Sequence, residues 1–286
     1  MAMNHDNEMT YSYFPGCSLA TSAKENNRSM LSFCQQHSVS LEELKDWNCC
    51  GSSSAHSIDS ELAHHLPARN LALAPPDRPL LVACPSCYLR LKSTHMDIAA
   101  DPEAQKEFGR MWGRAFNPDL QIINFFDMLA RVADSGAFEK NKESLKGLRF
   151  APYYGCMLMR PPKMRREPTF SGLMEKVLSS LGADPVQWAH KARCCGTFLS
   201  VSRPLVSARS VKTIMDGAEK AGAECIVTAC AMCHLNLEIR SQQGKIPVLH
   251  FSELLSLAGG IGQGQGWFRR HLIDPRPLLR SRRLIA

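Results

Sequence analysis

Short apolar runs alternate with longer amphipathic segments along most of the chain. Four of these runs have the length and apolar density of buried β-strands, and they span residues 11–15, 80–83, 149–153 and 225–229. Helical patterns follow them. One pattern has a start signal at Asp59 or Ser60, and another has Thr169 as a candidate N-cap and Gly182 as a stop. This alternation of strands and helices predicts an α/β fold with parallel sheets.

The cysteines show that the pattern is written twice. Ten of the twelve cysteines form two sets in the same order: a single cysteine, a Cys-Cys pair and a CxxC pair. The sets are Cys17, Cys49, Cys50, Cys84 and Cys87, and Cys156, Cys194, Cys195, Cys230 and Cys233. The intervals between these groups are 31, 33 and 2 residues in the first set and 37, 34 and 2 in the second. Neighbouring residues repeat as well, and self-similarity over such a long period indicates two related halves.

We therefore predict two related lobes from an internal duplication, each a small parallel sheet with flanking helices. The polar stretch 140–147 marks the boundary, which gives a first cysteine-rich lobe at 1–145, a second at 146–262 and a basic C-terminal tail at 263–286. Ligands of open α/β sheets collect beyond the carboxyl ends of the strands. Every cysteine group except the Cys-Cys pairs follows a predicted strand directly. Each set of five can therefore converge at one sheet edge if the loop that carries the pair folds over it.

Composition narrows the possible functions. A chain of 286 residues with 44% hydrophobic content can bury a core, and it has neither an apolar run of about 20 residues nor a start typical of a signal peptide. We expect a cytoplasmic protein, in which cysteines serve metal binding or thiol redox chemistry better than a disulfide scaffold. The net charge is +7, but residues 264–286 contribute +5 of it, through six arginines against one aspartate. The remaining +2 is too little for a nucleic-acid binder.

Five thiols per lobe limit the choice of cofactor. A structural zinc takes four ligands at about 2.3 Å and would leave one thiolate over, and adjacent cysteines in an extended backbone point to opposite faces. Neighbouring thiolates can bind different irons, so an iron–sulfur cluster fits better. The compact cysteine run of ordinary cubane clusters is absent. A vicinal disulfide in each Cys-Cys pair and haem attachment at "CAMCH" (230–234) remain alternatives.

The order of cysteine, long gap, Cys-Cys-Gly, long gap and CxxC, present twice, resembles the duplicated CCG cysteine-rich domain of the heterodisulfide reductase B-subunit family, including its sulfur-oxidising bacterial branch. The resemblance runs from Tyr13 to about Leu255 and includes all ten motif cysteines. In that family each set of five cysteines holds a non-cubane 4Fe-4S cluster, and a disulfide is cleaved between the two clusters. The resemblance therefore implies two such clusters here. The implied ligands are Cys17, Cys49, Cys50, Cys84 and Cys87 for one, and Cys156, Cys194, Cys195, Cys230 and Cys233 for the other.

The resemblance also implies a function and partners. The expected protein is the catalytic subunit of a heterodisulfide-reductase-like complex, an oxidoreductase that cleaves a disulfide or oxidises a thiol or sulfane sulfur. Electrons would pass through a ferredoxin-like iron–sulfur subunit, itself served by a flavoprotein subunit. The substrate would be a small anionic thiol or disulfide, or protein-bound sulfur. The alternative is an electron-transfer subunit of a hydroxy-acid oxidase or succinate:quinone reductase type complex, because the same domain occurs there.

A few residues outside the two sets are weaker candidates. His234, next to Cys233, is a candidate proton donor, although an ordinary helix residue is the simpler interpretation. The loop after Cys156 carries Lys163, Arg165 and Arg166, which could guide an anionic substrate, or could simply be solvated. The basic tail could dock on a partner or make peripheral contact with an anionic membrane, and its simpler interpretation is a flexible end. Cys34 and Cys225 belong to neither set, and we expect them to be buried thiols.

Overall fold

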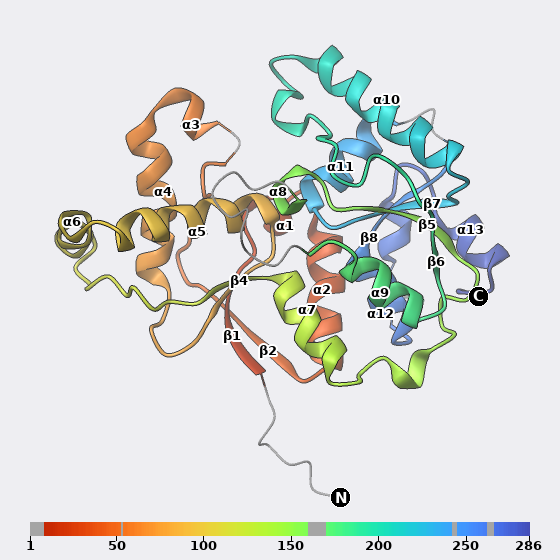
Figure 1. Cartoon of the computed structure of the whole chain (residues 1–286), viewed down its shortest axis with the longest axis horizontal. Helices are drawn as coiled ribbons and strands as arrows, with labels where there is room; N and C mark the ends of the chain where they lie inside the picture. Colours follow the sequence, from red (N-terminus) through yellow and green to blue (C-terminus); the bar gives the residue numbers. More distant parts are fainter. Residues whose placement is uncertain (1–8, 53, 160–169, 242–244, 262–265) are drawn as a thin grey trace, which may run out of the picture. The chain divides into compact units, whose positions relative to one another are not determined.

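The computed structural model describes residues 9–52, 54–159, 170–241, 245–261 and 266–286 (Figure 1). These residues form two four-stranded sheets in which the paired strands are parallel. The strand orders are β2-β1-β3-β4 and β6-β5-β7-β8, so the two sheets have the same topology. The predicted fold class, an α/β protein with a parallel sheet in each of two related lobes, is confirmed.

Four of the described strands, the inner two of each sheet, lie where the apolar runs predicted them. Their bounds are β1 (Met9–Phe14), β2 (Val39–Glu43), β3 (Leu80–Val82), β4 (Ile122–Asn124), β5 (Arg149–Tyr153), β6 (Asp184–Pro185), β7 (Cys225–Thr228) and β8 (Val248–His250). The inner strands β3 and β7 are buried along their whole length, which is why their sequences are continuously apolar. The edge strand β2 is buried only at Val39 and carries exposed glutamates at its end. Its sequence therefore lacks the apolar density that identified the inner strands.

The chain forms two compact units, and their division differs from the repeat boundary because a segment of the first repeat belongs to the second unit. One unit comprises Met1–Thr21 and Ser38–Met128, and it contains the first sheet. Its described helices are α1 (Cys17–Ala20), α3 (Ala55–Ile58), α4 (Ser60–Leu73), α5 (Pro85–Ala99) and α6 (Pro102–Trp112). The other unit comprises Ser22–His37 and Leu129–Ala286 and contains the second sheet. Its described α-helices, besides α7 (Phe125–Asp134), which straddles the division, are α2 (Lys24–Gln36), α8 (Cys156–Met159), α9 (Leu173–Ser180), α10 (Pro204–Lys220), α11 (Ala231–Arg240), α12 (Phe251–Ala258) and α13 (Arg276–Ser281).

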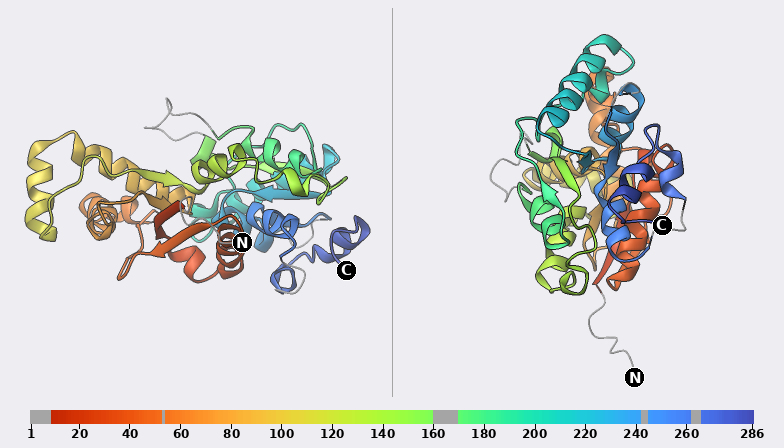
Figure 2. Two further views of the ribbon diagram at one scale, coloured as in Figure 1. Left: turned by 90° about the horizontal axis from the view of Figure 1, so that it is seen from below. Right: turned by 90° about the vertical axis from the view of Figure 1, so that its right-hand side faces the viewer.

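Helix α2 belongs to the second unit although it connects two strands of the first sheet. It lies beside α12 (Figures 1 and 2). Ser29 Oγ of α2 is 2.6 Å from Ser252 Oγ, and Ser256 Oγ donates to the Ser29 carbonyl at 2.7 Å. Met30 and Phe33 of α2 are almost fully buried. Apolar burial and hydroxyl hydrogen bonds together attach this helix to the second unit.

The sequence signals for helix starts located the beginning of α4 correctly but did not locate the beginning of α9. Asp59 is the N-cap of α4, and its carboxylate accepts a hydrogen bond from the Leu62 N–H at 2.8 Å, as the start signal predicted. Thr169, the other candidate N-cap, lies outside the described residues, and α9 begins only at Leu173. Gly182, the predicted stop, follows the end of α9 with a φ of +94°, a conformation that glycine adopts without strain.

The C-terminal segment 266–286 packs onto the second unit. Trp267 and Phe268 are 1% and 4% exposed, and Leu279 of α13 is fully buried. The interpretation of this segment as a flexible end is therefore wrong, because its aromatic pair fills the interior of its own chain. Arginines such as Arg269 and Arg283 remain exposed, and contact of this basic surface with a partner or a membrane stays a prediction. Among the described residues, none of the helices has the length and apolar character needed to cross a membrane.

Candidate iron–sulfur sites

The cysteines of each set follow the carboxyl ends of neighbouring strands. Cys17 begins α1 after β1, and Cys156 begins α8 after β5. Cys84 is the N-cap of α5 after β3, and Cys230 is the N-cap of α11 after β7. The second cysteine of each CxxC pair, Cys87 or Cys233, lies in the first turn of the same helix. A helix N-terminus stabilises a thiolate, which is the form that binds metals.

In the first unit the five sulfurs converge. Cys50 Sγ is 3.1 Å from Cys87 Sγ, and Cys49 Sγ is 3.6 Å from Cys17 Sγ. Cys84 is close enough to raise the pKa values of Cys17, Cys50 and Cys87 by repulsion between thiolates. Cys17 and Cys49 are exposed, and the other three cysteines are buried. The set therefore forms a thiol-lined site with one open side.

The second unit repeats this arrangement. Cys195 Sγ is 3.4 Å from Cys233 Sγ, and Cys156 is hydrogen-bonded to Cys194. Repulsion from Cys230 contributes to the raised pKa values of Cys156 and Cys233. Cys194 is exposed, as Cys49 is in the first unit. The structure thus brings together both predicted sets, and their role as cluster ligands stays a prediction.

The first cysteine of each Cys-Cys pair has a lowered pKa. Hydrogen bonds from Cys17 and then from Cys50 lower the pKa of Cys49 to about 2, and the hydrogen bond with Cys49 raises the pKa of Cys17. A hydrogen bond from Cys156 lowers the pKa of Cys194 to about 6. The following glycine assists in both units, because the Gly51 N–H lies 3.5 Å from Cys49 Sγ and the Gly196 N–H lies 3.3 Å from Cys194 Sγ. Each pair therefore offers a thiolate at its exposed position.

Two equivalent glycines leave space beside the buried sulfurs. Gly16 has a φ of +77°, and a Cβ atom there would lie 2.8 Å from Cys87 Sγ. Gly155 has a φ of +74°, and a Cβ atom there would lie 3.3 Å from Cys233 Sγ. Both positions therefore require glycine for conformation and for room. Five thiols, with space left beside the buried sulfurs by a glycine, form a donor set that fits a polynuclear iron–sulfur cluster.

In the first unit, side chains of α4 hold the residue that precedes the Cys-Cys pair. The Asn48 N–H donates to Asn70 Oδ1 at 2.9 Å, and Asn70 Nδ2 donates to the Asn48 carbonyl at 2.9 Å. Arg69 adds a hydrogen bond to Asn48 Oδ1 at 3.0 Å. The Asn70 side chain is fully buried, and its bonds to Asn48 fix the approach of the loop to the site.

In the second unit, β5 and α11 provide the equivalent support. The Tyr153 hydroxyl donates to the carbonyl of Arg193, the residue before the pair, at 2.6 Å. Asn236 Nδ2 donates to the carbonyl of Cys195 at 2.9 Å. Arg240 connects α11 to the same loop, because it donates to Asn236 Oδ1 and to the carbonyl of Ser200. The pair is therefore held from both the strand and the helix.

The other residues predicted from the sequence make contacts outside the cysteine sets or lie outside the described residues. His234 Nδ1 is 3.2 Å from Asn26 Nδ2, and His234 Nε2 is 3.1 Å from the carbonyl of Val248, so its hydrogen-bond partners are not cysteines. Its assignment as a proton donor stays a prediction. Lys163, Arg165 and Arg166 lie outside the described residues, together with the substrate-guiding role predicted for them. Cys34 and Cys225 are buried, as expected, and burial raises the pKa of Cys34 to about 12.

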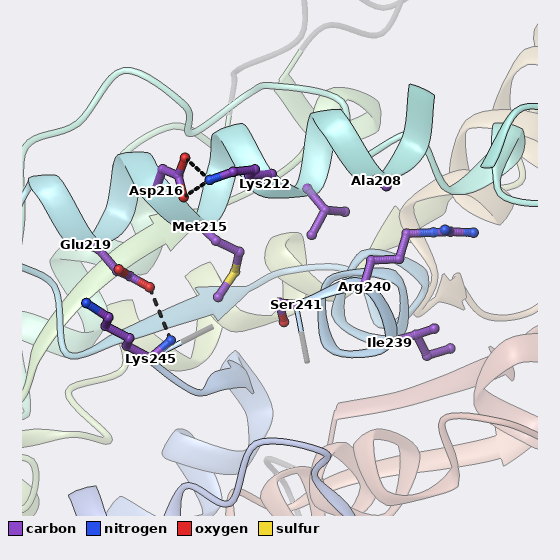
Figure 3. Close-up of a pocket in the computed structure, with 10 residues that line it drawn as sticks. Ala208, Lys212, Met215, Asp216, Glu219, Ile239, Arg240, Ser241 and Lys245 are labelled. Carbon is purple, nitrogen blue, oxygen red and sulfur yellow. Dashed lines mark hydrogen bonds and ion pairs between the residues drawn. The ribbon is translucent and has the colours of Figure 1, made fainter. Parts of the chain in front are cut away.

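A cavity of about 630 Å³ lies between α10 and the end of α11 (Figure 3). Its walls include Met215, Ile239 and the ion pair of Lys212 with Asp216, whose Nζ and Oδ2 are 2.7 Å apart. Glu219 accepts a hydrogen bond from the Lys245 N–H at 3.2 Å along one side. None of the motif cysteines lines this cavity, so it is not part of the thiol sites.

The sequence did not identify the residues that support the two sites. Asn70, Tyr153 and Asn236 act on backbone groups of the Cys-Cys loops, from positions 22, 40 and 41 residues away in the chain. A buried asparagine at a helical position would have been the available signal, because such a side chain needs hydrogen-bond partners. That signal does not say which loop the asparagine holds.

Comparison with known proteins agrees with this geometry. The cysteine-rich domain family, CCG, matches residues 11–92 and 150–238, one copy in each repeat. The 8-methylmenaquinol:fumarate reductase membrane anchor subunit of Wolinella succinogenes is 28% identical over 280 residues, covering 94% of this chain and 98% of that protein. The B-subunit of the ferredoxin:CoB-CoM heterodisulfide reductase of Methanosarcina mazei is 28% identical over 255 residues, covering 81% of this chain and 83% of that one.

A solved structure supports the fold. A hypothetical protein from Helicobacter pylori superposes with a TM-score of 0.70 at 13% sequence identity, covering 93% of this chain and 52% of that one. At this identity the likeness shows the fold alone. The family match extends over both cysteine sets, and it covers more than half of the chain. The chain belongs to the CCG cysteine-rich domain family, of which it carries two copies.

Proposed function

We propose that this protein is the iron–sulfur catalytic subunit of a heterodisulfide-reductase-like complex and holds two non-cubane 4Fe-4S clusters. The proposed ligands are the five convergent cysteines of each unit: Cys17, Cys49, Cys50, Cys84 and Cys87, and Cys156, Cys194, Cys195, Cys230 and Cys233. The observation that carries the proposal is the convergence of five thiols, rather than four, at equivalent places in both units.

The chain's own groups would prepare each site for its cofactor. Bound clusters would supply one electron each to the two-electron conversion of a disulfide into two thiols. The acidic thiols of Cys49 and Cys194 favour the ligating thiolate, and three further cysteines of each set are buried. Exposure of Cys17, Cys49 and Cys194 leaves an open side from which a sulfur substrate could approach. The proposed reaction is reductive cleavage of a disulfide or, in the other direction, oxidation of a thiol or sulfane sulfur.

A complex requires surfaces for partners. The most exposed large apolar side chains among the described residues are Val201, Ile58 and Leu205, at 94%, 75% and 74%. All three lie in the segments that directly follow the two Cys-Cys pairs. Exposed apolar groups in both of these segments support a covering partner subunit, for which we propose a ferredoxin-like iron–sulfur protein, with a flavoprotein behind it.

Anaerobic purification with iron and sulfide analysis tests the cofactor assignment. The wild type should hold roughly eight irons per chain, and Cys195→Ser should lose about half of them. Cys225→Ser is the matched control, because Cys225 is a buried thiol of the same unit outside the set. Equal iron content in Cys195→Ser and Cys225→Ser would contradict the ligand assignment.

A second candidate function is electron transfer in a complex of the succinate:quinone reductase type. The relative in Wolinella succinogenes favours it, because the two chains cover each other almost completely and that protein is a fumarate reductase subunit. In this case the same cysteines would hold clusters that relay electrons without touching a disulfide. Titration of the oxidised protein with small anionic thiols separates the candidates. New thiol-dependent EPR signals support sulfur chemistry, whereas unchanged spectra together with reduction by a quinol support electron relay.

A further inference from the structure

The C-terminal segment contributes a histidine to the interior of the second unit. The His271 side chain is 3% exposed, and it follows the short helix Trp267–Arg270, whose two aromatic residues are buried. His271 Nδ1 is 2.9 Å from Glu238 Oε1, and His271 Nε2 is 3.0 Å from Glu253 Oε1. The ring therefore lies between two carboxylates, one from α11 and one from α12.

A carboxylate at each ring nitrogen favours a charged histidine. Ionised carboxylates only accept hydrogen bonds, so both ring nitrogens of His271 must carry hydrogens. Burial by itself lowers the pKa of His271, but the carboxylates of Glu253 and Glu238 outweigh it and raise the pKa to about 10. His271 is therefore an imidazolium at neutral pH. It supplies the positive charge beside the buried Glu253, whose carboxylate is fully shielded from solvent.

The two carboxylates depend on this cation. Glu238 and Glu253 have side chains 7% and 0% exposed, and each approaches a different nitrogen of the same ring. Without the imidazolium, α11 and α12 would each hold a buried negative charge facing the other, which is strongly unfavourable in a protein interior. The neighbouring His234 does not replace it, because its ring nitrogens face Asn26 Nδ2 and the carbonyl of Val248.

Helix α11 links this cluster to the second thiol site. The helix starts at Cys230 as its N-cap, carries Cys233 in its first turn and has Glu238 near its end. It is only 10 residues long, so fixing its C-terminal half fixes the position of its first turn. The corresponding helix of the first unit, α5, is 15 residues long, and Lys92 occupies the position five residues after its CxxC pair.

We propose that His271 is a positioning residue for the second cysteine set: as an imidazolium between Glu238 and Glu253, it fixes α11 and thereby the place of Cys230 and Cys233. The proposal rests on the proposed function insofar as a cluster binds there. It assigns the C-terminal segment a role in one thiol site and none in the other.

The test combines three variants, studied anaerobically in the full chain. His271→Gln leaves the carboxylates without their cation, Glu238→Gln removes one carboxylate, and the double variant removes the cation and that carboxylate together. Each is made in the wild type and in Cys87→Ser, where only the second site should hold a complete ligand set. Arg276→Gln is the control, because Arg276 lies in the same segment and pairs with the nearby Asp274 rather than with the buried carboxylates.

Two measurements are made on each variant: the EPR signal and midpoint potential of the second cluster, and hydrogen exchange of α11 with and without iron. His271→Gln should lower the exchange protection of Ala231–Arg240 on the order of tenfold and shift the second cluster's potential, with α5 unchanged. The double variant should recover most of the loss, because it removes the repulsion. Glu238→Gln should have an intermediate effect, which keeps the test decisive if His271→Gln does not fold.

The outcomes distinguish the two proposals. If the wild type binds no iron, the proposed function fails, and hydrogen exchange of the iron-free protein still reports whether His271 fixes α11. If the wild type binds iron but both single variants leave α11 exchange and the second cluster's potential at the level of Arg276→Gln, the positioning role is overturned. A uniform loss of protection in both units, without recovery in the double variant, also overturns it.

Discussion

The two units carry the same thiol arrangement but hold it with different neighbours. In the first, Asn70 binds both backbone groups of Asn48, the residue before the Cys-Cys pair. In the second, the Tyr153 hydroxyl binds the carbonyl of Arg193, which is the residue before that pair. The comparison shows that the duplicated structure has kept the strand order and the convergence of the sulfurs, whereas the groups that fix the loops differ.

One aligned position illustrates this difference. Phe14 and Tyr153 each lie two residues before the glycine that precedes the first cysteine. Phe14 packs edge-on against Trp47 at 5.3 Å and has no hydroxyl, so the first loop needs Asn70 for its hydrogen bonds. Tyr153 supplies packing and a hydrogen bond together. Packing at this position and a hydrogen bond to the residue before the Cys-Cys pair therefore come from one side chain in the second unit and from two in the first.

The largest effect is expected when one buried cysteine of the proposed ligand set is removed from either unit, which tests whether the two thiol sites are equivalent. Cys87→Ser and Cys233→Ser should each lower the iron content by about half, because each residue belongs to only one set. Iron and sulfide analysis with EPR should show complementary signals in the two variants. Loss of all iron from either variant would show that the two sites do not assemble independently.

The next test uses the charge found only in the second unit. The pKa of His271 is about 10 in the folded chain and about 6.5 when unfolded, so its stabilising effect is complete below pH 6.5 and is lost as pH rises toward 10. The stability advantage of the wild type over His271→Gln should therefore fall by about 5 kcal/mol at most over this range. Denaturant unfolding at several pH values measures this. A pH-independent difference would show that His271 is not an imidazolium in the folded state.

Smaller effects are expected at the paired glycines. Gly16→Ala and Gly155→Ala share the cost of a left-handed conformation, about 1–2 kcal/mol. Gly16→Ala should be the more damaging, because its Cβ would lie 2.8 Å from Cys87 Sγ, against 3.3 Å from Cys233 Sγ at Gly155. Thermal unfolding and iron content of the two variants measure the difference. Equal losses would show that conformation, rather than space beside the sulfur, sets the requirement.

Effects of similar or smaller size should come from the loop supports. Asn70→Ala removes the buried bonds to Asn48 and should destabilise the chain by about 2 kcal/mol, whereas Tyr153→Phe removes one bond and should cost about 1 kcal/mol. Denaturant unfolding gives both values. If Tyr153→Phe proves as costly as Asn70→Ala, the hydroxyl holds more of the second loop than its single bond to Arg193 indicates.

Most of the fold could be predicted because its signals are local. The buried strands are apolar enough to be read directly, and Asp59 caps α4 through a neighbour three residues away. The four edge strands were not predicted. β2 is half polar, β6 has only two residues, and β4 and β8 have three residues each. The repeated cysteine spacing likewise identified both sets from the sequence, and the structure shows that the sulfurs of each set converge.

The remaining features depend on contacts between distant parts of the chain. His271 meets Glu238 and Glu253 across 33 and 18 residues, and no local pattern connects them. For the same reason the C-terminal arginines suggested a free basic end, while the neighbouring Trp267 and Phe268 are buried. Charge and composition describe a segment in isolation, whereas its burial depends on the surface that receives it.

Helix α2 belongs to the first repeat in sequence but packs in the second unit, and this limits how the two repeats could be separated. A polypeptide that stops after the first repeat would keep α2 but lose α12, whose Ser252 and Ser256 bind it. A polypeptide that starts after the first repeat would leave the buried side of α12 uncovered. Neither repeat should therefore fold independently. Separate expression of the two repeats should yield insoluble fragments rather than two folded domains.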